Sequence, residues 1–122
     1  MKFLIAYLFL VLVSCSEIQH KAYTKNISVI AFQSLLATQN GLQILDVRTP
    51  NEWADGIVQG AVQINWYEDS FNAKVELLDK NKPVVVYCKA GGRSKQAMYR
   101  LAQLGFKEVY NLEGGYDAYS SK

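Results

Sequence analysis

At its centre the chain reads Val84-Val85-Val86-Tyr87-Cys88-Lys89-Ala90-Gly91-Gly92-Arg93-Ser94. The β-branched run at its start is typical of a buried strand. The residues from 94 to 104 place apolar side chains at helical spacing and predict a helix. A cysteine between a strand and a helix, in a loop with glycines, is suited to form a thiolate. Backbone N–H groups and the positive end of the helix both favour negative charge there.

The composition of this loop favours chemistry over packing at Cys88. An unperturbed thiol ionises near pH ~8.5, and only the thiolate is a good nucleophile. Gly91 and Gly92 allow the backbone to curl its N–H groups around the sulfur, while Lys89 and Arg93 add positive charge nearby. A cysteine that only fills a core needs neither the glycines nor the arginine. We therefore predict that Cys88 is a nucleophile.

Around the loop, extended and helical patterns alternate along the chain. Strands are predicted at residues 42–47, 61–65, 84–87 and 107–112, and helices after Ser28 and at 49–55, 71–78, 94–104 and 116–119. Such alternation predicts an α/β fold with a parallel sheet covered on both faces. Binding sites in these folds form at the carboxyl ends of strands, where Cys88 lies.

Several neighbours of Cys88 are candidate site residues. Arg93 could position or stabilise an anionic sulfur substrate, or it could be a surface arginine. Lys89 could hold a sulfonate or an acidic partner, or it could simply be solvated. Ser94 could donate to the sulfur or cap the following helix, and capping is the expected role. Asp46 and Arg48, at the end of another strand, are expected to pair and to tie loops together rather than to act in catalysis.

The chain resembles rhodanese-domain sulfurtransferases in four segments that occur in the family's order and cover about residues 27–120. They are the cysteine loop, the Asp-x-Arg segment at 44–53, the glycine-containing segment at 56–64, and the closing glycine pair with its aromatic at 112–119. Two positions depart from the family pattern. Ile57 stands where a histidine is usual, and Gln59 stands where a proline is usual. Both changes bear on local turn geometry more than on activity.

The resemblance implies a rhodanese-like fold over residues 27–122, with a central, mostly parallel sheet and helices on both faces. It also implies that Cys88 takes sulfane sulfur from thiosulfate or a persulfide donor and passes it, as a cysteine persulfide, to a thiol or another thiophilic acceptor. The substrate-binding residues would be those of the loop, namely Lys89, Ala90, Gly91, Gly92, Arg93 and Ser94. No cofactor or metal is expected, and we expect a monomer.

Two other functions remain open at this stage. A cysteine phosphatase or arsenate reductase could use the same fold, but the loop from Cys88 to Arg93 holds six residues. The phosphatase-like relatives resemble this loop with one residue more, which enlarges the cradle for a tetrahedral oxyanion. A module that carries a persulfide without turnover is the second alternative.

The N-terminal residues predict export. Met1 and Lys2 precede 11 apolar residues, Phe3–Val13, and Leu12-Val13-Ser14-Cys15 resembles a bacterial lipobox. An apolar run of this length is typical of a signal peptide and short for a membrane span. We expect residues 1–14 to be a lipoprotein signal peptide, Cys15 to carry lipid, and residues 15–26 to be a tether. The domain would then lie in the bacterial cell envelope, on the periplasmic face of the inner or outer membrane. A plain uncleaved anchor is the alternative.

Composition narrows the possible partners. The chain of 122 residues is long enough for one domain, and its formal net charge of +2 with no basic run argues against nucleic acid. Neither a Cys/His cluster nor a nucleotide-binding glycine motif is present in the sequence, which disfavours metal and nucleotide cofactors. If Cys15 is lipidated, Cys88 is the only thiol and no internal disulfide can form, and a Cys15–Cys88 disulfide is the alternative.

Overall fold

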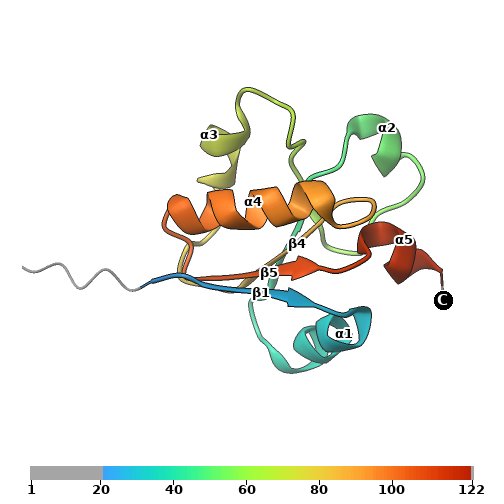
Figure 1. Ribbon diagram of the computed structural model, residues 1–122, viewed down its shortest axis with the longest axis horizontal. Coiled ribbons are helices and arrows are strands. Elements are labelled where there is room, and N and C mark those ends of the chain that lie inside the picture. Colours follow the sequence, from blue (N-terminus) through green and yellow to red (C-terminus); the bar gives the residue numbers. More distant parts are fainter. Residues whose placement is uncertain (1–20, 122) are drawn as a thin grey trace, which may run out of the picture.

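The computed structural model describes residues 21–121, which form one sheet with helices on both sides (Figure 1). Strands and helices alternate strictly along the chain. In order they are β1 (Tyr23–Ile27), α1 (Val29–Thr38), β2 (Gln43–Asp46), α2 (Pro50–Trp53), β3 (Val62–Gln63), α3 (Phe71–Val75), β4 (Val84–Tyr87), α4 (Gly92–Gln103), β5 (Glu108–Leu112) and α5 (Gly115–Ser120).

The five strands lie in the order β1-β5-β4-β2-β3, and every pairing is parallel. Parallel neighbours need a crossover between them, and the helices supply it. β4 lies in the middle of the sheet and is buried along its whole length. The predicted α/β fold, a parallel sheet with helices on both faces, is therefore confirmed (Figure 1).

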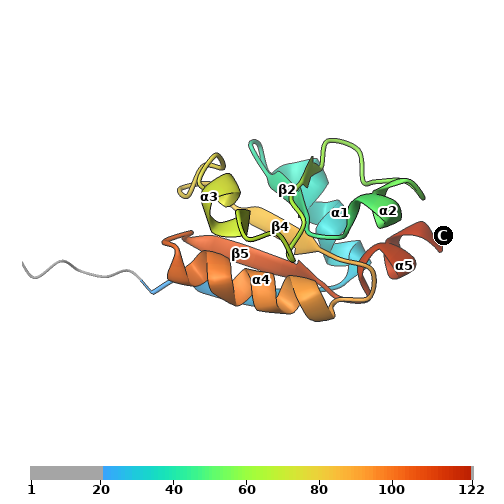
Figure 2. The same ribbon diagram turned by 90° about the horizontal axis from the view of Figure 1, so that it is seen from above.

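Side chains of β4 alternate between two hydrophobic cores, as the pleat of a strand requires. Val84 and Val86 pack with residues of α3 and α4, while Val85 and Tyr87 pack with residues of α1 and α5. Figures 1 and 2 show α3 and α4 on one side of the sheet and α1 on the other. Cys88 belongs to the core under α4, so the residue that follows β4 is delivered into a packed environment.

The first strand corrects the predicted domain boundary. Residues 23–26, which the sequence predicts to be part of the tether, are the first four positions of β1. This strand pairs with β5 from Tyr23 opposite Glu108 to Ile27 opposite Leu112. β1 lies at the edge of the sheet, where a strand can carry polar side chains on its solvent side. The polar sequence of this segment does not predict a strand, because backbone hydrogen bonds to β5, and not a row of buried apolar side chains, hold it in the sheet.

The predicted signal peptide and Cys15 lie outside the described residues. Within residues 21–121, no helix is both long enough and apolar enough to cross a bilayer.

The strand at the edge gives the first prediction. A chain that starts at residue 28 should unfold at least about 5 °C below a chain that starts at residue 21, because it loses the pairing of β1 and the buried Ile27 side chain. Both chains keep Ser28, whose Oγ accepts a hydrogen bond from the Ala31 N–H at the start of α1. Thermal unfolding followed by circular dichroism measures the difference. Equal midpoints would show that β1 adds no stability.

Candidate active site

The Cys88 sulfur is enclosed by its own loop. The residue follows β4 directly and is only 2% exposed. The Gly91 N–H donates to Sγ at 3.1 Å, and the Ser94 hydroxyl oxygen lies 3.3 Å from Sγ. The chain therefore turns back on itself within six residues and points polar hydrogens at the sulfur.

These contacts change the acidity of the thiol. Burial by itself raises the pKa of Cys88 because it disfavours the charged form. Hydrogen bonds from the Ser94 hydroxyl and from the backbone N–H groups of Ser94, Gly91 and Ala90 more than offset burial, and the pKa is lowered from its ordinary value. The loop thus stabilises a thiolate mainly through hydrogen bonds, as the glycine-containing sequence predicts.

Gly91 makes the turn toward the sulfur possible. It precedes α4 as the N-cap residue, with a φ of 108° that side chains disfavour. The helix therefore begins at Gly92, two residues earlier than predicted, and Ser94 is inside it. The expected capping role of Ser94 is wrong, because Gly91 occupies the cap and the Ser94 hydroxyl is directed to Cys88 and to Asn111.

The guanidinium group of Arg93 is held by Glu52 of α2 in a two-pronged ion pair. Nη1 and Nη2 of Arg93 donate to the two carboxylate oxygens at 2.6 and 2.8 Å. Thr49 donates to Glu52 from its backbone N–H and its hydroxyl. The hydrogen bond from Arg93, together with those from Thr49, lowers the pKa of Glu52 to about 2 despite partial burial. Arg93 thereby joins the start of α4 to α2, while its role toward an anionic substrate stays a prediction.

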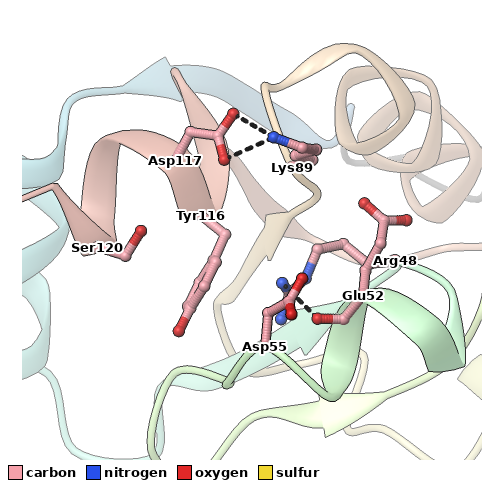
Figure 3. A pocket seen from close by; sticks show the side chains of 7 residues that line it. All are labelled: Arg48, Glu52, Asp55, Lys89, Tyr116, Asp117 and Ser120. Carbon is pink, nitrogen blue, oxygen red and sulfur yellow. Dashed lines mark hydrogen bonds and ion pairs between the residues drawn. The ribbon is translucent and has the colours of Figure 1, made fainter.

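Lys89 is likewise engaged. Its Nζ donates to both carboxylate oxygens of Asp117 in α5, at 2.9 and 2.8 Å, although the Lys89 side chain is 60% exposed. The sequence left open whether Lys89 holds a sulfonate or an acidic partner or is only solvated, and in the structure it has an acidic partner, Asp117. Figure 3 shows the pair at the side of a cavity of about 280 Å³, which is lined by Arg48, Glu52, Asp55, Lys89, Tyr116, Asp117 and Ser120.

Asp46 and Arg48 form the buried ion pair that the sequence suggested. Nη2 of Arg48 lies 2.8 Å from Oδ2 of Asp46, and both side chains are almost fully buried. Arg48 also donates to the carbonyl oxygens of Glu52 and Gly56, and the Tyr87 hydroxyl donates to Asp46 at 2.7 Å. The pair therefore ties the end of β2 to the segment around α2 and to the end of β4.

The first turn of α5 supports the cysteine loop from the other side. The backbone N–H groups of Tyr116 and Asp117 donate to the carbonyl oxygens of Cys88 and Lys89 at 2.8 and 3.0 Å. A Cβ on Gly115, whose φ is +56°, would lie 2.5 Å from the Cys88 oxygen and 2.6 Å from the Lys89 oxygen. Only glycine allows this close approach of two backbones.

Three residues of this site were missed from the sequence, namely Glu52, Asn111 and Gly115. In the sequence, Glu52 and Gly115 stand out only as parts of the segments that resemble the rhodanese family. Asn111 is a polar residue in the buried strand β5 and is 3% exposed. A buried polar residue needs partners, and this pattern was the available signal. Within residues 21–121, no cluster of three or more His, Cys, Asp or Glu side chains is arranged to hold a metal ion.

Comparison with known proteins agrees with the fold. The family model of the rhodanese-like domain matches residues 28–122 of this chain. A sulfurtransferase of Allochromatium vinosum is 35% identical over 70% of this chain and 78% of its own length. The thiosulfate sulfurtransferase GlpE of Pseudomonas aeruginosa is 34% identical over 68% of this chain and 74% of its own length.

Solved structures give the same result. A rhodanese-like domain protein from Staphylococcus aureus superposes with a TM-score of 0.70 at 29% identity, over 78% of this chain and 90% of that one. A protein of Staphylococcus saprophyticus has a TM-score of 0.69 at 35% identity, over 78% and 92% of the two chains. The α/β fold with a cysteine loop at the end of its central strand thus defines a rhodanese-like domain. The chain belongs to the rhodanese-like family, whose relatives include named sulfurtransferases.

The close contact at Gly115 gives the second prediction. Gly115→Ala should lower the reactivity of Cys88 toward iodoacetamide at neutral pH, because the new methyl group pushes the Cys88 and Lys89 carbonyls and the loop moves with them. Gly60→Ala is the matched control, since Gly60 also has a positive φ, of +83°, but nothing lies within 4 Å of its Cβ position. If both variants reacted like the parent, the support from α5 would not matter to the sulfur.

Proposed function

We propose that this member of the rhodanese-like family is a sulfurtransferase that works through a persulfide on Cys88. The thiolate attacks the outer sulfur of a sulfane donor such as thiosulfate. The new S–S bond forms as the donor's S–S bond breaks, and sulfite leaves with the bonding electron pair. A thiophilic acceptor, such as a thiolate or cyanide, then takes the outer sulfur and the Cys88 thiolate is restored. The enzyme acts as a monomer and needs no cofactor.

The observation that carries this proposal is the set of hydrogen bonds at the sulfur. Hydrogen bonds to Sγ from Gly91 and Ser94 lower the pKa of the thiol in spite of its burial, so a larger share of it is nucleophilic near neutral pH. The same turn of backbone can stabilise the anionic outer sulfur of a persulfide. The names of the two relatives support the reaction class, and one of them names thiosulfate.

The length of the loop bears on the choice of substrate. A phosphate or arsenate reacts at its central atom, so its oxygens must fit inside the loop, and the six-residue loop is short for them. A sulfane donor, whether a persulfide or thiosulfate, presents only its outer sulfur to Cys88. The loop length therefore favours transfer of sulfur over hydrolysis of a phosphate ester. The pairing of Arg93 with Glu52 and of Lys89 with Asp117 does not separate these substrates, because phosphate, arsenate and thiosulfate are all tetrahedral anions.

The third prediction concerns the nucleophile. Cys88→Ser should reduce thiosulfate:cyanide sulfurtransfer to background, because a hydroxyl is too weakly acidic to attack and cannot hold a sulfane sulfur. Thiocyanate formation measures turnover, and intact mass after incubation with thiosulfate measures addition of one sulfur to the protein. Circular dichroism of the variant controls for folding.

Each result of this experiment has a distinct meaning. Turnover and a sulfur adduct in the parent, both lost in Cys88→Ser, support the enzyme. A sulfur adduct without turnover would support the carrier that the sequence left open. Comparable turnover in parent and variant would contradict the assignment of Cys88.

We also propose that the domain is attached to a membrane in the bacterial envelope through lipid on Cys15. The support is the lipobox-like segment Leu12-Val13-Ser14-Cys15 after an apolar run that is short for a membrane span. At about 1.5 Å per residue, a helix over that run would cover only about half of a ~30 Å hydrocarbon core. Several acyl chains on one cysteine would supply the anchoring instead. The sequence between Cys15 and β1 would then connect lipid to domain.

The fourth prediction tests this attachment. Cys15→Ala should leave an unprocessed precursor that takes up no labelled fatty acid, because the residue that carries the lipid is missing. Metabolic labelling and membrane fractionation of the full chain in a bacterial host make the measurement, with Cys88→Ser as the control that keeps Cys15. Processing and fractionation unchanged from the parent would replace the lipoprotein by an ordinary signal or anchor.

A further inference from the structure

The hydroxyl group of Ser94 lies between two groups that can each accept a hydrogen bond from it. Its Oγ is 2.6 Å from Oδ1 of Asn111 and 3.3 Å from Sγ of Cys88. A hydroxyl has one hydrogen to donate, so it can serve only one of these partners at a time. Ser94 is fully buried and Asn111 is 3% exposed, so bulk solvent cannot replace either contact.

The orientation of the Asn111 amide is settled by its other neighbours. Its Nδ2 lies 3.2 Å from the carbonyl oxygen of Gly91 and 3.0 Å from Oδ1 of Asn26. The Gly91 carbonyl can only accept a hydrogen bond, so the NH₂ end of the amide faces it and the oxygen end faces Ser94. Because Oδ1 cannot donate, the short contact between Ser94 and Asn111 requires the Ser94 proton.

The two protonation states of Cys88 therefore use Ser94 differently. In the neutral thiol, S–H can donate to Ser94 Oγ while Ser94 donates to Asn111, and every group is satisfied. In the thiolate, the sulfur has no hydrogen and is best stabilised when Ser94 donates to it. The Asn111 oxygen is then left without a donor in a buried place, which is unfavourable.

We propose that Asn111 is a positioning residue that competes with Cys88 for the single proton of Ser94 and so keeps the thiolate from being fully stabilised. A thiolate that is stabilised less is a stronger nucleophile at a given degree of ionisation. The consequence for a persulfide rests on the proposed function. In the persulfide the negative charge lies on the outer sulfur, so a hydrogen bond from Ser94 to Sγ adds little. The Ser94 hydroxyl then donates to Asn111 again. The pair thus favours the loaded protein over the free thiolate.

The charged groups around the loop are arranged so that Asn111 can be tested by itself. Arg93 of α4 is the cation whose charge acts on Cys88, and it is paired with Glu52 of α2. Lys89 in the loop is paired with Asp117 of α5. The hydrogen-bond partners of Asn111 on β1, α4 and the loop are all uncharged groups. Replacing Asn111 by an apolar residue leaves these ion pairs in place.

The test is a double-mutant cycle on the pKa of Cys88 in the full chain. Asn111→Leu, which keeps about the same size without an acceptor, should lower this pKa by roughly 0.5–1 unit, since one net hydrogen bond is released to the thiolate. Asn111→Val, which suits a strand, should shift it the same way. Ser94→Ala should raise it. In the Ser94→Ala background, Asn111→Leu should have no effect, because no proton is left to compete for.

The readout is the pH dependence of alkylation by iodoacetamide, followed by mass spectrometry on the peptide that contains Cys88 so that Cys15 does not contribute. Circular dichroism confirms that each variant is folded. If Asn111→Leu does not fold, Asn111→Val replaces it in the double-mutant cycle. An unchanged or raised pKa in the folded Asn111 variant would overturn the proposal. So would an equal decrease in the Ser94→Ala background, since the effect would then not pass through Ser94.

A second measurement separates this proposal from the proposed function. At fixed thiosulfate and sulfite, above the pKa of the thiol, the ratio of persulfide to free protein should fall roughly 3- to 10-fold in Asn111→Leu, the same factor as the pKa shift. An unchanged ratio would overturn the role of Asn111 in loading. Complete absence of persulfide in the parent would overturn the proposed function, while the pKa cycle would still decide the competition for the proton.

Discussion

A sulfur that must carry charge inside a protein depends on hydrogen-bond donors at short range, and this need shapes the site. Cys88 is buried, and burial alone would keep its thiol neutral. The donors come mainly from the backbone of the residues that follow it. A backbone can curl in this way only where glycine tolerates a positive φ, as at Gly91. The loop must also be held in place, because a donor displaced by an ångström loses much of its effect.

Three ion pairs hold the surroundings of the loop, and their burial decides what each contributes. Asp46 and Arg48 are almost fully buried, and each satisfies further hydrogen bonds, so loss of one partner would leave an uncompensated buried charge. Arg93 and Glu52 are partly buried and meet in a two-pronged geometry that fixes the start of α4 against α2. Lys89 and Asp117 are exposed, and such pairs contribute little stability. The hydrogen bonds from α5 to the carbonyls of Cys88 and Lys89 supply the remaining support.

Much of the fold and the centre of the site could be predicted before the structure. The β-branched run before Cys88, the glycines after it and the alternation of strands with helices led to the parallel sheet and to the position of the loop. Prediction failed where partners come from distant segments. Glu52 lies 41 residues before Arg93, and Asp117 lies 28 residues after Lys89. No local pattern shows that these side chains meet, so neither ion pair could be predicted from the sequence.

The sequence by itself determined the local geometry of this protein: a central buried strand, a glycine-permitted turn, a cysteine at its start and a helix after it. These follow from propensities and steric limits that act within a few residues. Only the tertiary structure decided that residues 23–26 belong to the sheet, because an edge strand is defined by the backbone of its neighbour β5. It also decided which proton acceptor stands beside Ser94. Asn111 reaches it across 17 positions of sequence through the parallel pairing of β5 with β4, since contacts of this kind exist only once the sheet has formed.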